Sequence, residues 1–149
     1  MLNKKHAAVS GRLVIVGFGS IGQGILPLLM RHLEIDPGQV TIITAEPRGH
    51  ELAAEYGVHF IETALTPENY RAVLDRRLGH GDFLLNVSVD VSSVALIELC
   101  QEKGALYLDT CIEPWPGGYT DPSLPPAARS KGPGLFVATA KKQRQPRKR

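Results

Sequence analysis

The chain has only two cysteines in 149 residues, Cys100 and Cys111. Two thiols make a poor disulfide framework, so we expect a reducing cytoplasm as the compartment. No apolar run approaches the roughly 18 residues needed to span a membrane. Residues 1–10 contain two lysines but no apolar stretch of the kind that forms a signal peptide. These absences predict a protein without a membrane partner.

Acidic residues are absent from the end of the sequence. Residues 131–149 contain seven Lys or Arg residues and no Asp or Glu, which leaves ten basic against fifteen acidic residues in the first 130. The body of the chain is therefore acidic, and all the positive excess lies in the tail. We expect residues 131–149 to be disordered, residues 1–10 to be flexible, and residues 11–130 to form one domain, because the chain is too short for two domains of ordinary size.

Apolar segments with the patterns of strands and helices alternate along the body. The predicted strands are residues 13–16, 40–44, 58–61, 83–87 and 105–108. Between them we expect a first helix that Pro27 should kink, a short helix around residues 52–56, a helix from Thr66 to about Leu78, and a helix over residues 91–103. Alternating strands and helices predict a Rossmann-like, doubly wound parallel α/β sheet. Numbered along the chain, its strands should have the order 3-2-1-4-5.

Three spaced glycines follow the first strand directly. Gly17 permits a tight turn, Gly19 lets the backbone come close to a pyrophosphate, and Gly22 lets the next helix pack against the strand. The N–H groups and positive dipole end of that helix would face the phosphates. We therefore predict a dinucleotide site formed by Gly17, Gly19, Ser20, Ile21 and Gly22. The alternative is a purely structural turn from strand to helix.

An acidic residue, Glu46, lies just beyond the second predicted strand. A carboxylate at this distance accepts hydrogen bonds from the adenosine ribose hydroxyls and repels a 2′-phosphate, which favours NAD over NADP. Arg48 could have the opposite effect and bind that phosphate. Both residues could also be solvated loop charges. We predict NAD as the cofactor.

Polar residues also follow the fourth and fifth predicted strands, at the edge where ligands bind in open parallel sheets. They include Asn86, Asp90, Asp109 and Glu113, and such acids suit a cationic substrate such as an amine. Trp115 could add a cation–π face for an ammonium group.

Structural roles are the alternative for several of these residues. Asp90 and Ser92 could cap the following helix, and Asp109 could hold its loop. We expect Cys111 to be a small packed thiol rather than a nucleophile, because no partner base is identifiable.

Two segments carry a resemblance to a known family. Residues 83–93 (FLLNVSVDVSS) and 107–119 (YLDTCIEPWPGGY) are similar to those of bacterial homospermidine synthases, members of the saccharopine dehydrogenase-like group. The match extends from about Gly11 to Ser130. The resemblance implies an enzyme of polyamine biosynthesis, a homodimer that holds NAD tightly, transfers an aminobutyl group between two putrescine molecules and releases ammonia. It also implies that Asp90 and Glu113 bind the diamine.

The sequence departs from that family after Ser130. There the family continues into a second domain that supplies substrate contacts and the dimer surface, whereas here an unrelated basic segment begins. We therefore expect that a truncation or a frameshift separates this chain from the second domain, and that the fragment alone is inactive. The sequence assigns no catalytic residues and no metal site.

Two other functions are alternatives to this one. A saccharopine or carboxynorspermidine dehydrogenase would need Arg or Lys for its carboxylate substrates, where this sequence offers acids. A non-catalytic nucleotide-binding module would use the basic tail as an arm for nucleic acid, a partner that we do not expect.

Overall fold

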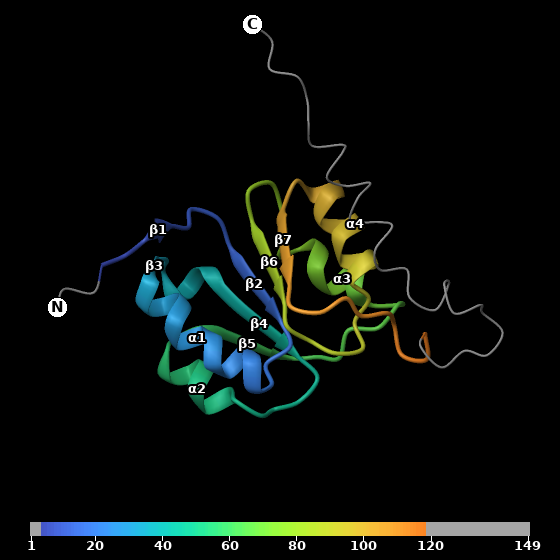
Figure 1. The fold of residues 1–149 in the computed structure, drawn as a ribbon, viewed down its shortest axis with the longest axis horizontal. Coiled ribbons are helices and arrows are strands. Elements are labelled where there is room, and N and C mark those ends of the chain that lie inside the picture. Colours follow the sequence, from blue (N-terminus) through green and yellow to red (C-terminus); the bar gives the residue numbers. More distant parts are fainter. Residues whose placement is uncertain (1–3, 119–149) are drawn as a thin grey trace, which may run out of the picture.

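The computed structural model describes residues 4–118, and the predictions made for residues 119–149 lie outside this range. Five parallel strands form one sheet in the order β5-β4-β2-β6-β7 (Figure 1). These strands are β2 (Leu13–Val16), β4 (Val40–Thr44), β5 (His59–Glu62), β6 (Phe83–Asn86) and β7 (Leu106–Asp109). Counting only these five along the chain, the order is the predicted 3-2-1-4-5. The structure thus confirms a Rossmann-like α/β fold.

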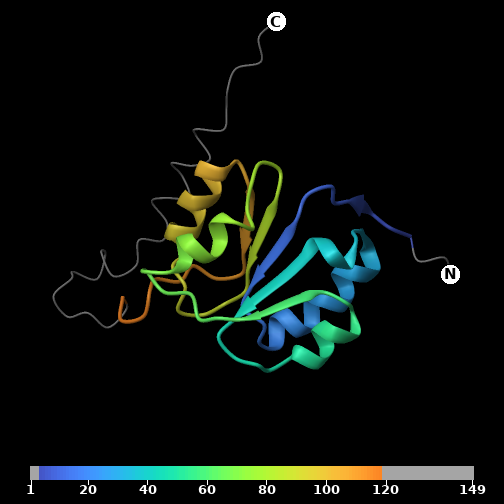
Figure 2. The ribbon, with the colours of Figure 1, turned by 180° about the vertical axis from the view of Figure 1, so that it is seen from behind.

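Helices cover both faces of the sheet, as Figures 1 and 2 show from opposite sides. Helices α1 (Ser20–His32) and α2 (His50–Glu55) lie on one face, and α3 (Tyr70–Asp75) and α4 (Ser93–Lys103) lie on the other. All four side chains of β2 are buried, alternately against the two helical layers. Burial on both faces explains why the strands read as continuous apolar runs rather than alternating ones.

The amino-terminal segment adds a feature that the sequence did not predict. Strand β1 (Ala7–Ala8) pairs in parallel with β3 (Leu33–Glu34), just after α1, in a separate two-stranded sheet. Two residues without an alternating pattern give no strand signal, so the sequence predicts only a flexible segment here. The domain boundaries near residues 10 and 130 stay predictions.

Two helices begin later than their sequences suggested. The helix expected from Thr66 begins at Tyr70, because the Asn69 side chain accepts from the Thr66 N–H (2.8 Å) and holds a turn there. It also ends earlier, at Asp75. Helix α4 begins at Ser93 rather than Val91.

Pro27 was expected to kink the first helix. It does not interrupt α1, which is continuous from Ser20 to His32.

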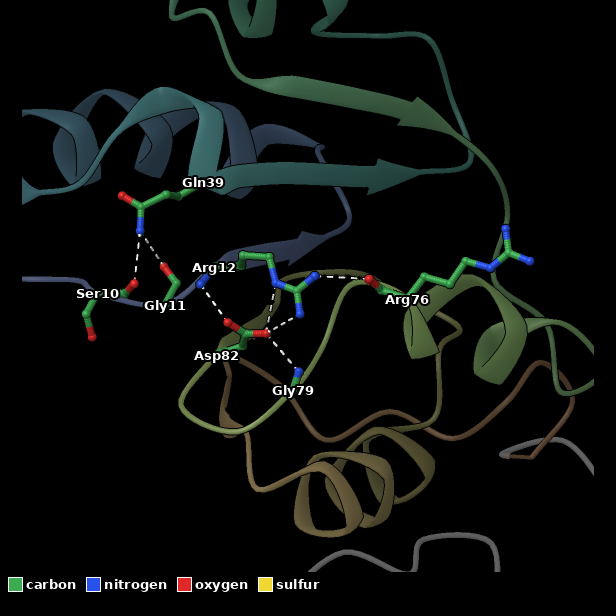
Figure 3. Close-up of polar contacts among 7 residues, drawn as sticks. All are labelled: Ser10, Gly11, Arg12, Gln39, Arg76, Gly79 and Asp82. Carbon is green, nitrogen blue, oxygen red and sulfur yellow. Dashed lines mark hydrogen bonds and ion pairs between the residues drawn. The ribbon is translucent and has the colours of Figure 1, made fainter.

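The amino ends of the strands are held by an ion pair between Arg12 and Asp82 (Figure 3). The buried Asp82 carboxylate accepts hydrogen bonds from the Arg12 backbone N–H, Nε and Nη2, and from the Gly79 N–H, at 2.7–3.0 Å. Burial by itself would raise the pKa of Asp82, but the hydrogen bonds from Arg12 and Gly79 outweigh it and lower that pKa. This cluster therefore fixes β2 beside β6 at the edge of the sheet opposite the candidate site.

Candidate functional site

The loop that leaves β2 requires glycine at two of its positions. Gly17 has a φ of 87°, and a Cβ there would lie 2.6 Å from the Ser88 Cα. A Cβ on Gly22 would lie 2.9 Å from the Gly17 carbonyl oxygen and from Phe18 Cδ2. Gly17 thus lets the loops after β2 and β6 touch, and Gly22 lets α1 approach the sheet closely. The two loops meet where strand order reverses, which is where open α/β sheets bind ligands.

Gly19 has different surroundings, because a Cβ built there meets no atom within 4 Å. It is the N-cap of α1, and among the described residues no side chain caps this helix end and no acid occupies its first turn. Ser20 and Ile21 are exposed, with Ile21 at 54%. An uncapped helix N-terminus leaves N–H donors for an anion. The open backbone at Gly19 therefore fits the close approach of a pyrophosphate.

Glu46 lies in the loop after β4, beside the glycine loop. The Gly17 N–H donates to the Ile43 carbonyl (2.8 Å), and Glu46 follows three residues later. The nearest cation is Arg48, whose Nη2 lies 3.9 Å from Glu46 Oε2, and the Glu46 side chain is 69% exposed. Such an exposed pair contributes little free energy, so Glu46 can exchange Arg48 for another partner.

Asn86 is buried, and its amide is used within the protein. Its Oδ1 accepts from the Ser88 N–H (3.2 Å) and Oγ (2.6 Å), and its Nδ2 donates to the Tyr107 hydroxyl (3.2 Å). Tyr107 in turn donates to Asp109 Oδ2 (2.9 Å). Burial is the main cause that raises the pKa of Tyr107, so the phenol keeps its proton. Asn86 therefore holds the loop after β6 through its amide, Asp109 is tied to the same network through Tyr107, and a substrate contact by Asn86 stays a prediction.

Asp90 has an exposed side chain and a φ of 61°, the only positive φ of a non-glycine residue among those described. It does not cap α4, because that cap is Ser92, whose Oγ accepts from the Ala95 N–H (3.3 Å). Capping by Asp90 was thus a wrong alternative. Left-handed backbone costs an ordinary residue about 1–3 kcal/mol and concentrates at functional sites.

Glu113 is half-buried, and its backbone is bound to Ser93 at the start of α4. Cys111 was expected to be packed, but it is exposed, and Cys100 is the buried thiol. The Cys111 thiol donates to Glu113 Oε1 (3.4 Å), and this hydrogen bond is the main cause that raises the pKa of Cys111. A thiol held in its protonated form is a poor nucleophile.

Trp115 is half-buried and packs on the core beneath α3 and α4. Its ring centroid lies 5.5 Å from that of Tyr70, at an interplanar angle of 55°. Contact with Tyr70 gives Trp115 an anchoring role for the loop after β7, in addition to the ammonium contact predicted from the sequence.

Sequence reasoning missed Ser88, Ser93 and Tyr107, whose hydroxyl groups hold these loops. Tyr107 belongs to a largely apolar strand, so the sequence does not indicate that its hydroxyl group binds a loop. Ser93 follows the cap residue Ser92, and the sequence does not distinguish the roles of the two serines. Among residues 4–118, no helix is long and apolar enough to cross a membrane. The same residues contain no cluster of three or more His, Cys, Asp or Glu side chains that could hold a metal ion.

The sheet order and the glycine loop define a Rossmann-type dinucleotide-binding domain. A family model described as the saccharopine dehydrogenase NADP binding domain matches residues 13–145. The chain belongs to this family.

The relatives found are homospermidine synthases. The chain is 46% identical over 125 residues to that of Blastochloris viridis and 39% identical over 128 residues to that of Mesorhizobium japonicum (strain LMG 29417 / CECT 9101 / MAFF 303099). These matches cover 82% and 84% of this chain but 26% of each relative. The chain therefore spans about a quarter of the length of the curated relatives it matches.

A solved structure shares the fold. It is the homospermidine synthase of Legionella pneumophila in complex with NAD, with a TM-score of 0.72 and 46% sequence identity. The superposition covers 75% of this chain and 24% of that one.

Proposed function

We propose that this chain is the NAD-binding part of a homospermidine synthase. The observation that carries the proposal is the open backbone at Gly19 on the uncapped N-terminus of α1. That geometry accepts a pyrophosphate, and the similarity to a homospermidine synthase solved with NAD supports this cofactor. The reaction proposed for the whole protein converts two putrescine molecules to homospermidine and ammonia, with the NAD recycled.

In this proposal the chain's own residues bind and orient. Residues 17–22 hold the pyrophosphate through backbone N–H groups, and Glu46 accepts from the adenosine ribose. When bound, NAD supplies a group that accepts a hydride and returns it. Asp90 and Glu113 attract the two ammonium groups of a diamine. No residue among those described is assigned a proton-transfer or nucleophilic role.

The charge of the two loops supports a diamine over a substrate with carboxylates. Neither residues 87–92 nor residues 110–118 contain Lys or Arg, whereas both contain an acid. A carboxylate beside these acids would be repelled, because no cation of the same loops would balance it. The basic residues that a saccharopine-type substrate would need are absent from these two loops.

The proposal also includes a homodimer for the full-length protein and a cytoplasmic location.

We expect the chain to bind NAD more tightly than NADP. Replacing Glu46 with Ala should weaken NAD binding by about 10- to 100-fold, since a hydrogen bond to a charged group contributes about 1.5–3 kcal/mol. NADP binding should be unchanged or stronger, because the charge facing its 2′-phosphate is gone. Isothermal titration calorimetry of both cofactors measures this, with the exposed Glu51 of α2, changed to Ala, as the matched control. Equal losses of NAD and NADP affinity would contradict the ribose assignment.

We also expect the 149-residue chain alone to make no measurable homospermidine. An imine intermediate needs a site that excludes water, and exposed carboxylates hold an ammonium group only weakly. The chain covers 26% of its relatives, so the wall that would orient the diamine is not expected within it. Incubation with NAD and putrescine, followed by mass spectrometry, checks this against the Blastochloris viridis enzyme. Turnover comparable to that enzyme would show that this chain carries the whole site.

A further inference from the structure

The loop after β7 is held by one residue of α4. Ser93 is fully buried, and its Oγ accepts from the Glu113 N–H (3.0 Å) and donates to the Cys111 carbonyl (3.3 Å). The Ser93 N–H donates to the Glu113 carbonyl (2.8 Å). Three hydrogen bonds thus tie residues 111–113 to the first residue of the helix, and two of them depend on the hydroxyl group.

The same residue is close in sequence to the other acid of the candidate site. Asp90 precedes Ser93 by three residues, and the intervening Val91 and Ser92 are both buried. Buried neighbours restrict the movement of the backbone between Asp90 and Ser93. Asp90 and Glu113 come from different loops, and both loops are anchored at the start of α4.

We propose that Ser93 is a positioning residue that fixes Glu113 relative to Asp90. A diammonium chain can contact both carboxylates only while they are held in place, so Ser93 would keep Glu113 ready for the diamine. The choice of a diamine rests on the proposed function. The fixed position of Glu113 rests on the three hydrogen bonds alone.

Ser92 provides a matched control one residue away. It is also buried, but its hydroxyl accepts from the Ala95 N–H and caps α4. Ser92→Ala therefore removes a hydroxyl from the same turn of the helix without removing a hydrogen bond to residues 111–113.

Cys111 provides a reporter for the position of Glu113. The hydrogen bond to Glu113 is the largest cause that raises the pKa of this exposed thiol, followed by slight burial and the charges of Glu113 and Asp109. Cys100 is buried, and burial raises its pKa to about 11. Alkylation of Cys111 as a function of pH therefore reports whether Glu113 stays beside it, while Cys100 reacts only when the protein unfolds.

The experiment measures alkylation of both cysteines by iodoacetamide in the whole chain, from neutral to alkaline pH, by peptide mass spectrometry. Ser93→Ala should lower the pH midpoint of the Cys111 reaction and make it several-fold faster near neutral pH, as Glu113→Gln should. Ser92→Ala should leave the midpoint unchanged. Rates are compared only in samples whose Cys100 peptide stays unmodified, because alkylation of this buried thiol reports unfolding. A Ser93→Ala midpoint equal to that of the original chain would overturn the proposal.

Putrescine, added up to concentrations that saturate even the weak ammonium binding expected of exposed carboxylates, separates this inference from the proposed function. An ammonium group bound to Glu113 should weaken the effect of that carboxylate and lower the Cys111 midpoint in the original chain but less in Ser93→Ala. If Ser93→Ala shifts the midpoint and putrescine does not, the positioning role of Ser93 stands and the diamine assignment fails. If putrescine shifts the midpoint equally in both proteins, Ser93 does not position Glu113 for the diamine.

Discussion

A Gly19→Val chain is expected to fold normally and to lose NAD binding. A Cβ at Gly19 meets no protein atom within 4 Å, and its φ of −75° lies outside the left-handed region, so we expect the fold to accept a side chain at this position. The added side chain would instead occupy the space that the pyrophosphate needs. We expect affinity for NAD to fall about 100-fold or more, which corresponds to about 2.7 kcal/mol. Calorimetric titration with NAD, together with the thermal midpoint of unfolding, measures both effects.

The matched control for this substitution is Gly24→Val, in the next turn of α1. A Cβ at Gly24 also meets nothing within 4 Å, and Gly24 is exposed. It should keep its affinity for NAD, because this position lies beyond the first turn, whose N–H groups are free. If the Gly19 variant binds NAD as well as the Gly24 variant, the glycine loop does not hold the pyrophosphate.

The glycine loop and the sheet could be predicted because their signals are local. An apolar strand followed by Gly17, Gly19 and Gly22 specifies a turn and a close helix within a few residues of the chain. The clash that a Cβ on Gly17 would make with Ser88 could not be read in this way, since it joins loops 71 residues apart. Long-range contacts of this kind depend on the register of neighbouring strands, which could not be predicted from this sequence alone.

The partners of the polar residues at the strand ends are equally hard to predict, because they too come from distant parts of the chain. The sequence shows that Asn86 follows a strand, but not that Ser88 and Tyr107 would surround its amide. It shows two cysteines, but not that Cys111 would be exposed beside Glu113. Polar residues at a strand end are candidates for binding and for holding loops alike. Only the hydrogen-bond partners separate these two roles.

Removal of the Asp82 carboxylate is expected to cause the largest loss of stability. Asp82→Ala leaves the N–H groups of Arg12 and Gly79 without their acceptor at the start of β2 and β6. The Asp82 carboxylate is buried but the Arg12 side chain is 49% exposed, so we expect a loss of about 1–3 kcal/mol, the cost of leaving buried donors without an acceptor, out of a typical stability of about 5–15 kcal/mol. Urea denaturation near neutral pH measures this loss. The control is Asp75→Ala, which removes a carboxylate that is 49% exposed, against 8% for Asp82, from its pair with Lys103 and should cost less than about 1 kcal/mol.

The pH dependence of this loss distinguishes the charge of Asp82 from its packing. The pKa of Asp82 is lowered from its ordinary value of 3.8, so the folded state binds this proton more weakly than the unfolded state does. The stabilisation is therefore fully present above pH 3.8 and is lost as the pH falls through the lower folded-state pKa. The difference in unfolding free energy between the original chain and Asp82→Ala should shrink over that range. A difference that stays constant below pH 3.8 would mean that Asp82 stabilises the fold by packing rather than by its charge.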